Sequence, residues 1–173
     1  MCEFVLENGY RVSRLGDDDR PAVSDLCKRC SDYYLLHCEV LPAEREVKEI
    51  FEDLPPNKGY EDKFVLGVYG TESDLVGVLD VIRDYVVKGE WTLGLMILDP
   101  KERGQGLGKR IHNSFIFWAK GLGAESFRLG VIEENKNGHA FWNAMGYEKI
   151  KEVSMTFIEK THIVNVMTLR LPE

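Results

Sequence analysis

The chain has 173 residues and a net charge of −7, with 44% hydrophobic and 29% charged residues, which is typical of a globular protein with a core of its own. The acidic balance argues against a nucleic-acid-binding protein, and the short apolar runs argue against a membrane span. The N-terminal residues carry no basic segment followed by an apolar one, so we expect a single domain over residues 1–173, located in the cytoplasm.

The first third of the chain predicts one strand and two helices. The strand is expected at residues 9–15, and Pro21 stands at a first-turn position of a helix that continues through Cys38. A second helix follows Pro42 and is ended by the proline pair at 55–56. Its apolar residues recur at helical spacing: Val47, Ile50, Phe51 and Leu54.

Cys27 and Cys30 form a C-x-x-C motif on the first predicted helix. No second cysteine pair or histidine pair follows at the spacing of a zinc finger. Both cysteines share a helical stripe with Val23, Leu26 and Tyr34, so we interpret them as core residues and expect no metal site. A redox or metal-binding pair is the alternative interpretation.

The rest of the chain predicts six strands and two helices. A hairpin is expected at 63–70 and 73–87, followed by a third strand at 90–98. Apolar residues then recur at helical spacing over 107–122. The remaining elements are expected to be a strand at 126–132, a short helix at 137–146, and strands at 154–159 and 161–171.

This order of elements indicates the fold class. One strand, two helices, three strands, a helix, a strand, a short helix and two strands predict an α+β fold of the α/β/α sandwich type. We expect a mixed, mostly antiparallel, twisted sheet of about six to seven strands with helices on both faces.

Glycines stand at positions 104, 106 and 108 in the stretch LDPKERGQGLGKRIH, between a predicted strand and a predicted helix. Two known phosphate-binding loops fit this stretch poorly. The P-loop pattern fails because arginine occupies its first glycine position and its final Ser/Thr position. The dinucleotide-binding pattern G-x-G-x-x-G fails because Lys109 stands at its third glycine.

The same stretch nevertheless has the chemistry of a phosphate cradle. A helix N-terminus presents unpaired amide groups and favours negative charge, and glycines let a diphosphate approach the backbone closely. The alternative is a glycine-rich turn with solvated basic residues. The basic side chains of the stretch are Lys101, Arg103, Lys109 and Arg110.

Residues 103–108 read R-x-x-G-x-G, and a second motif follows further along the chain. Together with the order of elements from Gly9 onward, the two motifs resemble the GNAT family of N-acetyltransferases, most strongly over residues 91–147. The second motif consists of Asn135, Gly138, Phe141, Trp142 and Gly146-Tyr147.

The resemblance implies an N-acetyltransferase that moves an acetyl group from acetyl-CoA directly to a primary amine, with a GNAT-like fold and no metal. The backbone of the strand before the loop would hold the pantetheine arm, and a main-chain amide near its end would polarise the thioester carbonyl. Asn135 has an alternative role as the N-cap of the short helix. The implied cofactor-binding residues are Met96, Leu98, Arg103, Gly104, Gln105, Gly106, Leu107, Gly108, Lys109, Asn135 and Trp142.

The catalytic base departs from the family's pattern. The positions where the family often has glutamate fall on Thr92 and Gly130, which are not acidic. Glu90 shares a strand face with Thr92 and is one predicted base. Asp80 on the neighbouring strand is the other, with Asp84 as an alternative.

The catalytic acid departs from the pattern as well. The family's usual tyrosine falls on Trp142, whose indole cannot donate a proton near neutral pH. Tyr147 is the predicted acid, with core packing as its alternative role, and His139 is interpreted as an exposed helix residue. A thiol has a pKa near 8.5, so CoA leaves as a thiolate without much help.

The acceptor pocket of the family is built from the first two helices and the last strand pair, which here offer Tyr33, Tyr34 and His37. We expect a small-molecule or peptide amine as the partner, with no nucleic acid and no membrane, and homodimerisation as an open alternative. Two other functions stay open. One is a non-catalytic acyl-CoA-binding regulatory module, and the other is a domain that binds ATP or NAD at the glycine loop.

Overall fold

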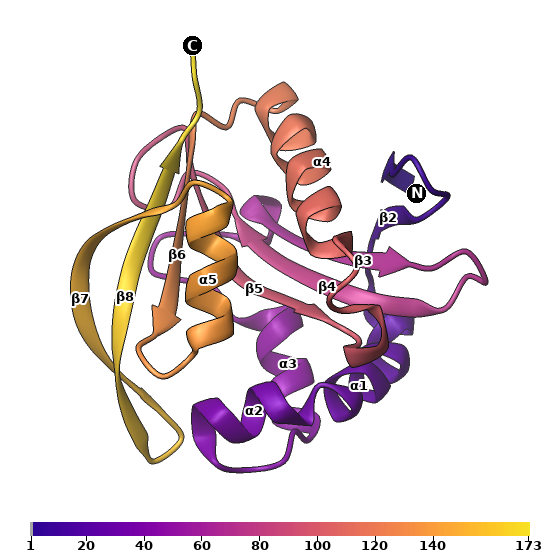
Figure 1. Ribbon diagram of the computed structural model, residues 1–173, viewed down its shortest axis with the longest axis horizontal. Coiled ribbons are helices and arrows are strands. Elements are labelled where there is room, and N and C mark those ends of the chain that lie inside the picture. Colours follow the sequence, from indigo (N-terminus) through magenta and orange to yellow (C-terminus); the bar gives the residue numbers. More distant parts are fainter. Residues whose placement is uncertain (1) are drawn as a thin grey trace.

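The computed structural model describes residues 2–173, whose strands form one eight-stranded sheet (Figure 1). The strand order is β1-β2-β3-β4-β5-β6-β8-β7, and every neighbouring pair is antiparallel except β5–β6. The strands are β1 (Cys2–Val5), β2 (Arg11–Arg14), β3 (Lys63–Tyr69), β4 (Leu75–Ile82), β5 (Glu90–Leu98), β6 (Ser126–Ile132), β7 (Glu148–Phe157) and β8 (Lys160–Arg170). The helices are α1 (Arg20–Arg29), α2 (Ser31–Cys38), α3 (Glu44–Glu52), α4 (Leu107–Gly121) and α5 (Lys136–Ala144).

The helices form two layers, one on each face of the sheet. Helices α1, α2 and α3 pack on one face, whereas α4 and α5 pack on the other (Figure 1). The predicted sandwich with a mixed, mostly antiparallel sheet is therefore confirmed, although the sheet has eight strands rather than six or seven. Within residues 2–173, no helix combines the length and apolar character needed to cross a bilayer.

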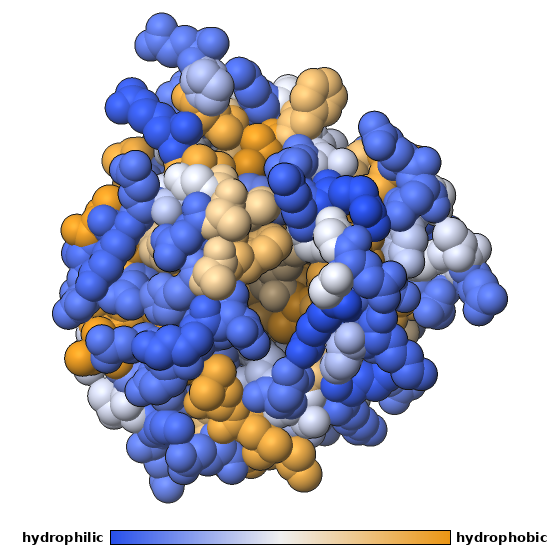
Figure 2. Space-filling model, viewed as in Figure 1, coloured by the Kyte–Doolittle hydropathy of each residue, from blue (hydrophilic) through white to orange (hydrophobic). Residues whose placement is uncertain are grey.

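The sheet opens between β5 and β6. These parallel strands pair only where Glu90–Thr92 meet Ser126–Arg128. Beyond that point β5 stays with β4 as far as Leu98, with a bulge at Gly94, and β6 stays with β8 as far as Ile132. The strands therefore diverge, and Figure 2 shows the surface hollowed near its centre, with an apolar floor, hydrophobic residues along one side and hydrophilic residues along the other.

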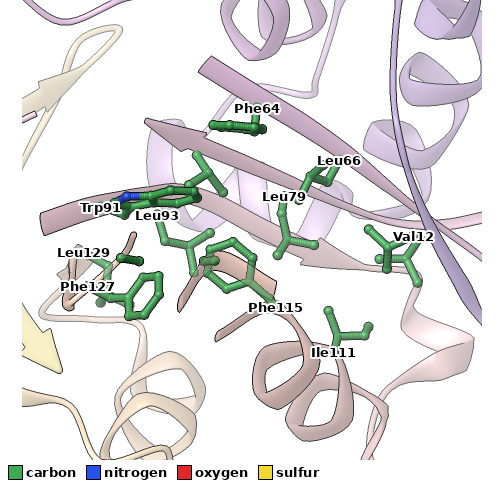
Figure 3. Close-up of a cluster of buried hydrophobic side chains, with 14 of the residues drawn as sticks. Val12, Phe64, Leu66, Leu79, Trp91, Leu93, Ile111, Phe115, Phe127 and Leu129 are labelled. Carbon is green, nitrogen blue, oxygen red and sulfur yellow. The ribbon is translucent and has the colours of Figure 1, made fainter. Parts of the chain in front are cut away.

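The larger apolar cluster lies between the sheet and α4 (Figure 3). Four buried residues of α4 recur at every fourth position and so form one stripe along the helix. Trp91 of β5 and Phe127 of β6 oppose each other in the sheet and pack against this stripe. The residues of the stripe are Leu107, Ile111, Phe115 and Ala119.

The second apolar cluster lies between the sheet and α1–α3 and contains the cysteines of the C-x-x-C motif. Cys27 and Cys30 are free, buried thiols, so their interpretation as core residues is confirmed. Burial raises the pKa of Cys30 to about 11, which keeps it a thiol at neutral pH. The described part of the chain holds no group of three His, Cys, Asp or Glu side chains that could bind a metal ion.

The first predicted helix is in fact two helices. α1 ends at Arg29, and Cys30 has φ −93° and ψ 28°, outside helical geometry. The Cys30 Sγ lies 3.3 Å from the carbonyl oxygen of Leu98 at the end of β5. The break therefore lies at a tertiary contact, and no glycine or proline marks it in the sequence.

The strands also differ from the prediction by one additional strand and two boundaries. β1 is an additional short edge strand that pairs with β2. β7 begins at Glu148 rather than at 154, where its first residues pair with β8. These residues are charged and exposed on an edge strand, so they lack the apolar pattern that marks a strand in the sequence. β4 ends at Ile82 rather than at 87, because the chain turns there and Asp84 has a φ of +53°.

Candidate active site

A cavity of about 500 Å³ occupies the gap between β5 and β6. Its walls come from both strands, from the glycine loop and the start of α4, from α5, and from α2 of the other helical layer. Cavities of this size hold small-molecule ligands. The divergence of the strands therefore brings the predicted phosphate loop and the first helical layer to one site.

The glycine loop is fixed where it leaves β5. The carboxylate of Asp99 accepts hydrogen bonds from Lys101 N at 2.9 Å and from Arg29 Nε at 2.6 Å. Gly104 and Gly106 then have φ values of +76° and +79°. Residues with a Cβ atom rarely adopt this left-handed conformation, so the course of the backbone requires glycine at both positions.

The backbone N–H groups of residues 104–109 have no hydrogen-bond acceptor among residues 2–173. The groups on either side are paired, since Arg103 N donates to Pro100 O at 3.3 Å and Arg110 N donates to Gly106 O at 3.2 Å. Unpaired N–H groups at the start of a helix attract anions. This donor set fits a diphosphate.

Only some side chains of the glycine loop line the cavity. Arg103 and Lys109 line the cavity together with the three glycines. Gln105 is exposed and donates from Nε2 to Lys101 O at 3.2 Å, while Leu107 is buried in the core. Gln105 and Leu107 are therefore not lining residues of the cavity, although their backbone amides belong to the unpaired row.

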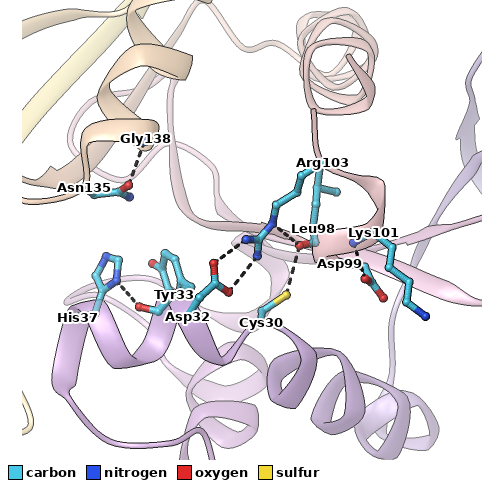
Figure 4. A network of polar contacts seen from close by, with 10 residues as sticks. All are labelled: Cys30, Asp32, Tyr33, His37, Leu98, Asp99, Lys101, Arg103, Asn135 and Gly138. Carbon is cyan, nitrogen blue, oxygen red and sulfur yellow. Dashed lines mark hydrogen bonds and ion pairs between the residues drawn. The ribbon is translucent and has the colours of Figure 1, made fainter. Parts of the chain in front are cut away.

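Arg103 is bonded to a helix of the opposite layer (Figure 4). Its Nη1 and Nη2 lie 2.6 and 3.3 Å from the carboxylate oxygens of Asp32 on α2, and its Nε donates to Leu98 O at 3.0 Å. The hydrogen bonds from Arg103 lower the pKa of Asp32. Nothing near Asp32 in the sequence points to a partner on so distant a loop, so the sequence analysis missed it.

Met96 and Leu98 line the cavity from β5. Asp99 N donates to Val76 O on the β4 side at 2.8 Å. Successive residues of a strand point their N–H groups to opposite edges, so the amides of Leu98 and Met96 face the gap. The carbonyl of Leu98 faces the same way, because two side chains rather than β4 bond to it.

Asn135 caps α5 and also lines the cavity. Its Oδ1 accepts a hydrogen bond from Gly138 N at 2.9 Å, which is the N-cap arrangement considered as the alternative role (Figure 4). Phe141 and Trp142 of the same helix form an apolar wall beside it, with ring centroids 4.7 Å apart. A cap and a ligand contact are compatible, since the cap uses only the Oδ1 atom.

Replacing Asn135 by serine separates these two roles. Serine caps helices about as well as asparagine, so we expect the free energy of unfolding to change by less than about 0.5 kcal/mol. Serine lacks the amide donor, so the affinity for CoA is expected to fall by about fivefold, the effect of one hydrogen bond worth about 1 kcal/mol. Urea unfolding and titration calorimetry measure the two quantities. CoA affinity that is unchanged in both Asn135→Ser and Asn135→Ala would leave Asn135 as a cap alone.

Glu90 does not line the cavity. It is 8% exposed, and its Oε1 accepts a hydrogen bond from Arg128 Nε at 2.7 Å, across the last paired stretch of β5 and β6. Removing either partner would leave a buried charge unpaired. Glu90 thus supports the point where the strands part, and its catalytic role stays a prediction from the sequence.

Asp80 lies behind the cavity wall rather than in it. Its Oδ1 is 2.8 Å from Lys63 Nζ, which also donates to Asp53 O at 2.9 Å. Burial raises the pKa of Asp80 to about 6, against the attraction of Lys63. A Cβ atom built on Gly94, which does line the cavity, would lie 3.8 Å from Asp80 Oδ2. The carboxyl group is therefore close to the cavity but bound to a lysine.

The raised pKa of Asp80 predicts a dependence of stability on pH. The folded state holds this proton more tightly than the unfolded state, so the contribution is complete below about pH 4 and is lost as the pH rises through about 6. In wild type the free energy of unfolding should therefore fall by on the order of 2 kcal/mol between pH 4 and pH 7 through this group. In Asp80→Asn this decrease should be absent. Urea unfolding at pH 4, 5, 6 and 7 tests it. Parallel curves for the two proteins would contradict it.

Tyr147 is a core residue and does not line the cavity. Its hydroxyl oxygen lies 3.0 Å from His112 Nε2, and burial raises the pKa of Tyr147 above its ordinary value. The position of Tyr147 agrees with its alternative role in core packing. Its role as the catalytic acid stays a prediction. His139 is half-buried rather than exposed, and its Nε2 lies 3.2 Å from Ile132 O.

The cavity residues of α2 are Asp32, Tyr33, Leu36 and His37. The rings of Tyr33 and His37 lie 4.0 Å apart, so these two predicted acceptor-pocket residues do meet at the cavity. Tyr34 does not, because it is buried with its hydroxyl 3.4 Å from Cys27 Sγ. The sequence indicated the helix but not which of its faces reaches the gap.

The segment that carries these cavity walls matches a known family of enzymes. Residues 29–147 match the family model of the acetyltransferase (GNAT) family. This chain belongs to the GNAT family. The family consists of acyltransferases, and the match includes α2, the diverging strands, the glycine loop and α5 of this GNAT protein.

Relatives and solved structures agree with this assignment. The uncharacterized N-acetyltransferase YobR of Bacillus subtilis (strain 168) is 31% identical over 108 residues, which are 61% of this GNAT protein but only 39% of that relative. A crystal structure of an acetyltransferase from Thermus thermophilus is similar with a TM-score of 0.74 at 19% identity, covering 99% and 100% of the two chains. Spermidine N-acetyltransferase from Vibrio cholerae, in complex with CoA and spermine, is similar with a TM-score of 0.70 at 16% identity, covering 93% and 95%. At such identities the structural likeness shows the fold.

Proposed function

We propose that this GNAT protein is an N-acetyltransferase that moves an acetyl group from acetyl-CoA directly to a primary amine. The observation that carries the proposal is the row of unpaired N–H groups at residues 104–109, beside a cavity that runs between diverging strands. Residues 1–173 would act as a single acetyltransferase domain.

The proposed binding mode follows the donors around the cavity. The diphosphate of acetyl-CoA would accept hydrogen bonds from the loop amides, and Lys109 would add positive charge. The pantetheine arm would lie along the β5 edge, bonded by the amide of Met96 and reached from the other side by Asn135. The amide of Leu98 would polarise the thioester carbonyl, an effect worth about 2.7–4 kcal/mol for a well-placed donor.

We propose a small-molecule or peptide amine as the acceptor. It would approach from α2, where Tyr33 and His37 line the cavity. Support for the amine class comes from the names of relatives, since one similar structure is a spermidine N-acetyltransferase bound to CoA and spermine. A cytoplasmic location would supply both substrates.

The proposal is tested by incubating the protein with acetyl-CoA and each of three amines, namely spermidine, L-lysine and an alanyl tripeptide. Free thiol is followed with a chromogenic disulfide, and the acetylated amine is followed by mass spectrometry. We expect at least one amine to release CoA well above the amine-free control, with one acetyl group transferred per thiol. Calorimetric binding of acetyl-CoA without thiol release for any amine would instead support a non-catalytic acyl-CoA-binding module.

A further inference from the structure

Few side chains at the cavity are able to take up a proton. Lys109 and Arg103 are cations that have donors only. The hydrogen bonds from Arg103 lower the pKa of Asp32, so this carboxylate is a weak base, and burial raises the pKa of Tyr33 to about 12. Among the described lining residues, His37 is left as the group whose basicity suits neutral pH.

The hydrogen bonding of His37 fixes its tautomer. Its Nδ1 lies 2.7 Å from the carbonyl oxygen of Tyr33 on the same helix (Figure 4). A carbonyl oxygen only accepts, so Nδ1 carries the hydrogen and Nε2 of the neutral ring carries the lone pair. Nε2 has no hydrogen-bond partner within residues 2–173. It is also not one of the unpartnered side-chain atoms that are buried away from solvent. The lone pair is therefore in contact with solvent, on a side chain that lines the cavity.

The ring of His37 is also held in place. It stacks on Tyr33 with a centroid distance of 4.0 Å and a tilt of 31°, and it meets the edge of Phe157 of β7 at 5.7 Å. Its own carbonyl oxygen accepts a hydrogen bond from His162 Nε2 of β8 at 2.7 Å. A base needs such a fixed position, because proton transfer requires hydrogen-bond geometry with the substrate.

The surroundings favour the neutral ring. Burial lowers the pKa of His37, which is the largest effect. Lys160 and His162 of β8 lower the pKa of His37 further. The Tyr33 carbonyl and Glu134 raise this pKa, and Glu134 is itself bonded to His162 Nδ1 at 3.0 Å. A neutral imidazole with an open lone pair is the form that accepts a proton.

We propose that Nε2 of His37 takes the proton from the acceptor amine, an inference that rests on the proposed acetyl transfer. The amine nitrogen bonds to the thioester carbonyl carbon, the C–S bond breaks, and its electron pair leaves on the CoA sulfur. The surplus proton on the nitrogen moves to His37 Nε2. The imidazolium then passes that proton to the thiolate, which yields the amide and free CoA and restores the ring.

The test compares His37→Gln with wild type, using whichever of spermidine, L-lysine and the alanyl tripeptide reacts fastest. We expect kcat to fall about 100-fold, the lower range for the loss of general base catalysis, while the calorimetric affinity for CoA stays within twofold. Protonation of the amine substrate lowers log kcat/KM toward acid pH in every variant. Wild type should show an additional acid limb as the pH falls through the His37 titration, and the variant should lack this additional limb. Imidazole added to His37→Ala should restore part of the rate.

Two further variants make the result specific. His139→Gln makes the same chemical change at a histidine that does not line the cavity, and we expect it to keep the wild-type rate. The inference is overturned if His37→Gln keeps wild-type kcat and pH profile, or if Asp80→Asn rather than His37→Gln removes the additional acid limb. If glutamine at 37 prevents folding, the additional acid limb of the intact protein must coincide with the titration of His37 followed by NMR, and a mismatch overturns it. Wild type that is inactive with every amine would instead count against the proposed function.

Discussion

Gly106→Val is expected to weaken the binding of CoA by about 100-fold. Gly106 has a φ of +79° and lines the cavity at the start of α4. Valine is strained in this conformation, so the loop must change its course and turn neighbouring amides away from the diphosphate. Losing two charge-assisted hydrogen bonds at about 1.5 kcal/mol each accounts for the factor. Titration calorimetry with CoA measures the change.

Gly123→Val provides the matched control. Gly123 has a φ of +99°, with nothing within 4 Å of the position a Cβ atom would take, and it lies beyond the other end of α4. The substitution causes comparable backbone strain away from the cavity, so stability should fall in both variants while CoA affinity falls only in Gly106→Val. Equal affinities in the two variants would show that the loop amides do not hold the ligand.

Trp91→Ala is expected to lower the free energy of unfolding by about 3–5 kcal/mol. Trp91 is 1% exposed and lies in the cluster drawn in Figure 3. Its ring stacks on Phe64 with a centroid distance of 5.3 Å and meets the edge of Trp118 at 5.9 Å. No neighbouring backbone can collapse into the space left by an indole in the middle of a sheet. A domain of this size is stable by about 5–15 kcal/mol in total, so this one change removes a large share.

Urea and thermal unfolding measure the loss, and we expect Tm to fall by about 10 °C. Phe117→Ala is the control, because Phe117 is a large aromatic residue of α4 that is 83% exposed. Its removal should change the free energy of unfolding by less than about 0.5 kcal/mol. Equal losses in the two variants would mean that the cluster around Trp91 is not the main core.

The sequence predicted the elements whose signals are local. The stripe of α4 and the apolar strands 63–70 and 90–98 stand out by period alone, and the structure places them where expected. The break at Cys30 and the charged start of β7 have no local signal. The break lies where Cys30 contacts Leu98, and the charged strand pairs with β8, so both involve residues far away in the sequence.

The residues of the candidate site also differ in how well the sequence predicts them. The glycine loop was predictable because backbone conformation and anion binding both depend on a few consecutive residues. The catalytic base is harder to predict, because it depends on which side chains the fold turns toward the cavity. Glu90 lies on β5 and Asp80 on the neighbouring β4, and Arg128 and Lys63 bind these two carboxylates outside the cavity.

An NMR titration tests the central claim most directly. Amide resonances of Gly104, Gly106 and Gly108 are followed as CoA is added, and pantetheine, which lacks the diphosphate, serves as the comparison. We predict large, saturable shifts of these three resonances with CoA, little change with pantetheine, and no change at Gly121 and Gly123 with either ligand. Resonances of the three loop glycines that stay in place at saturating CoA would contradict the account.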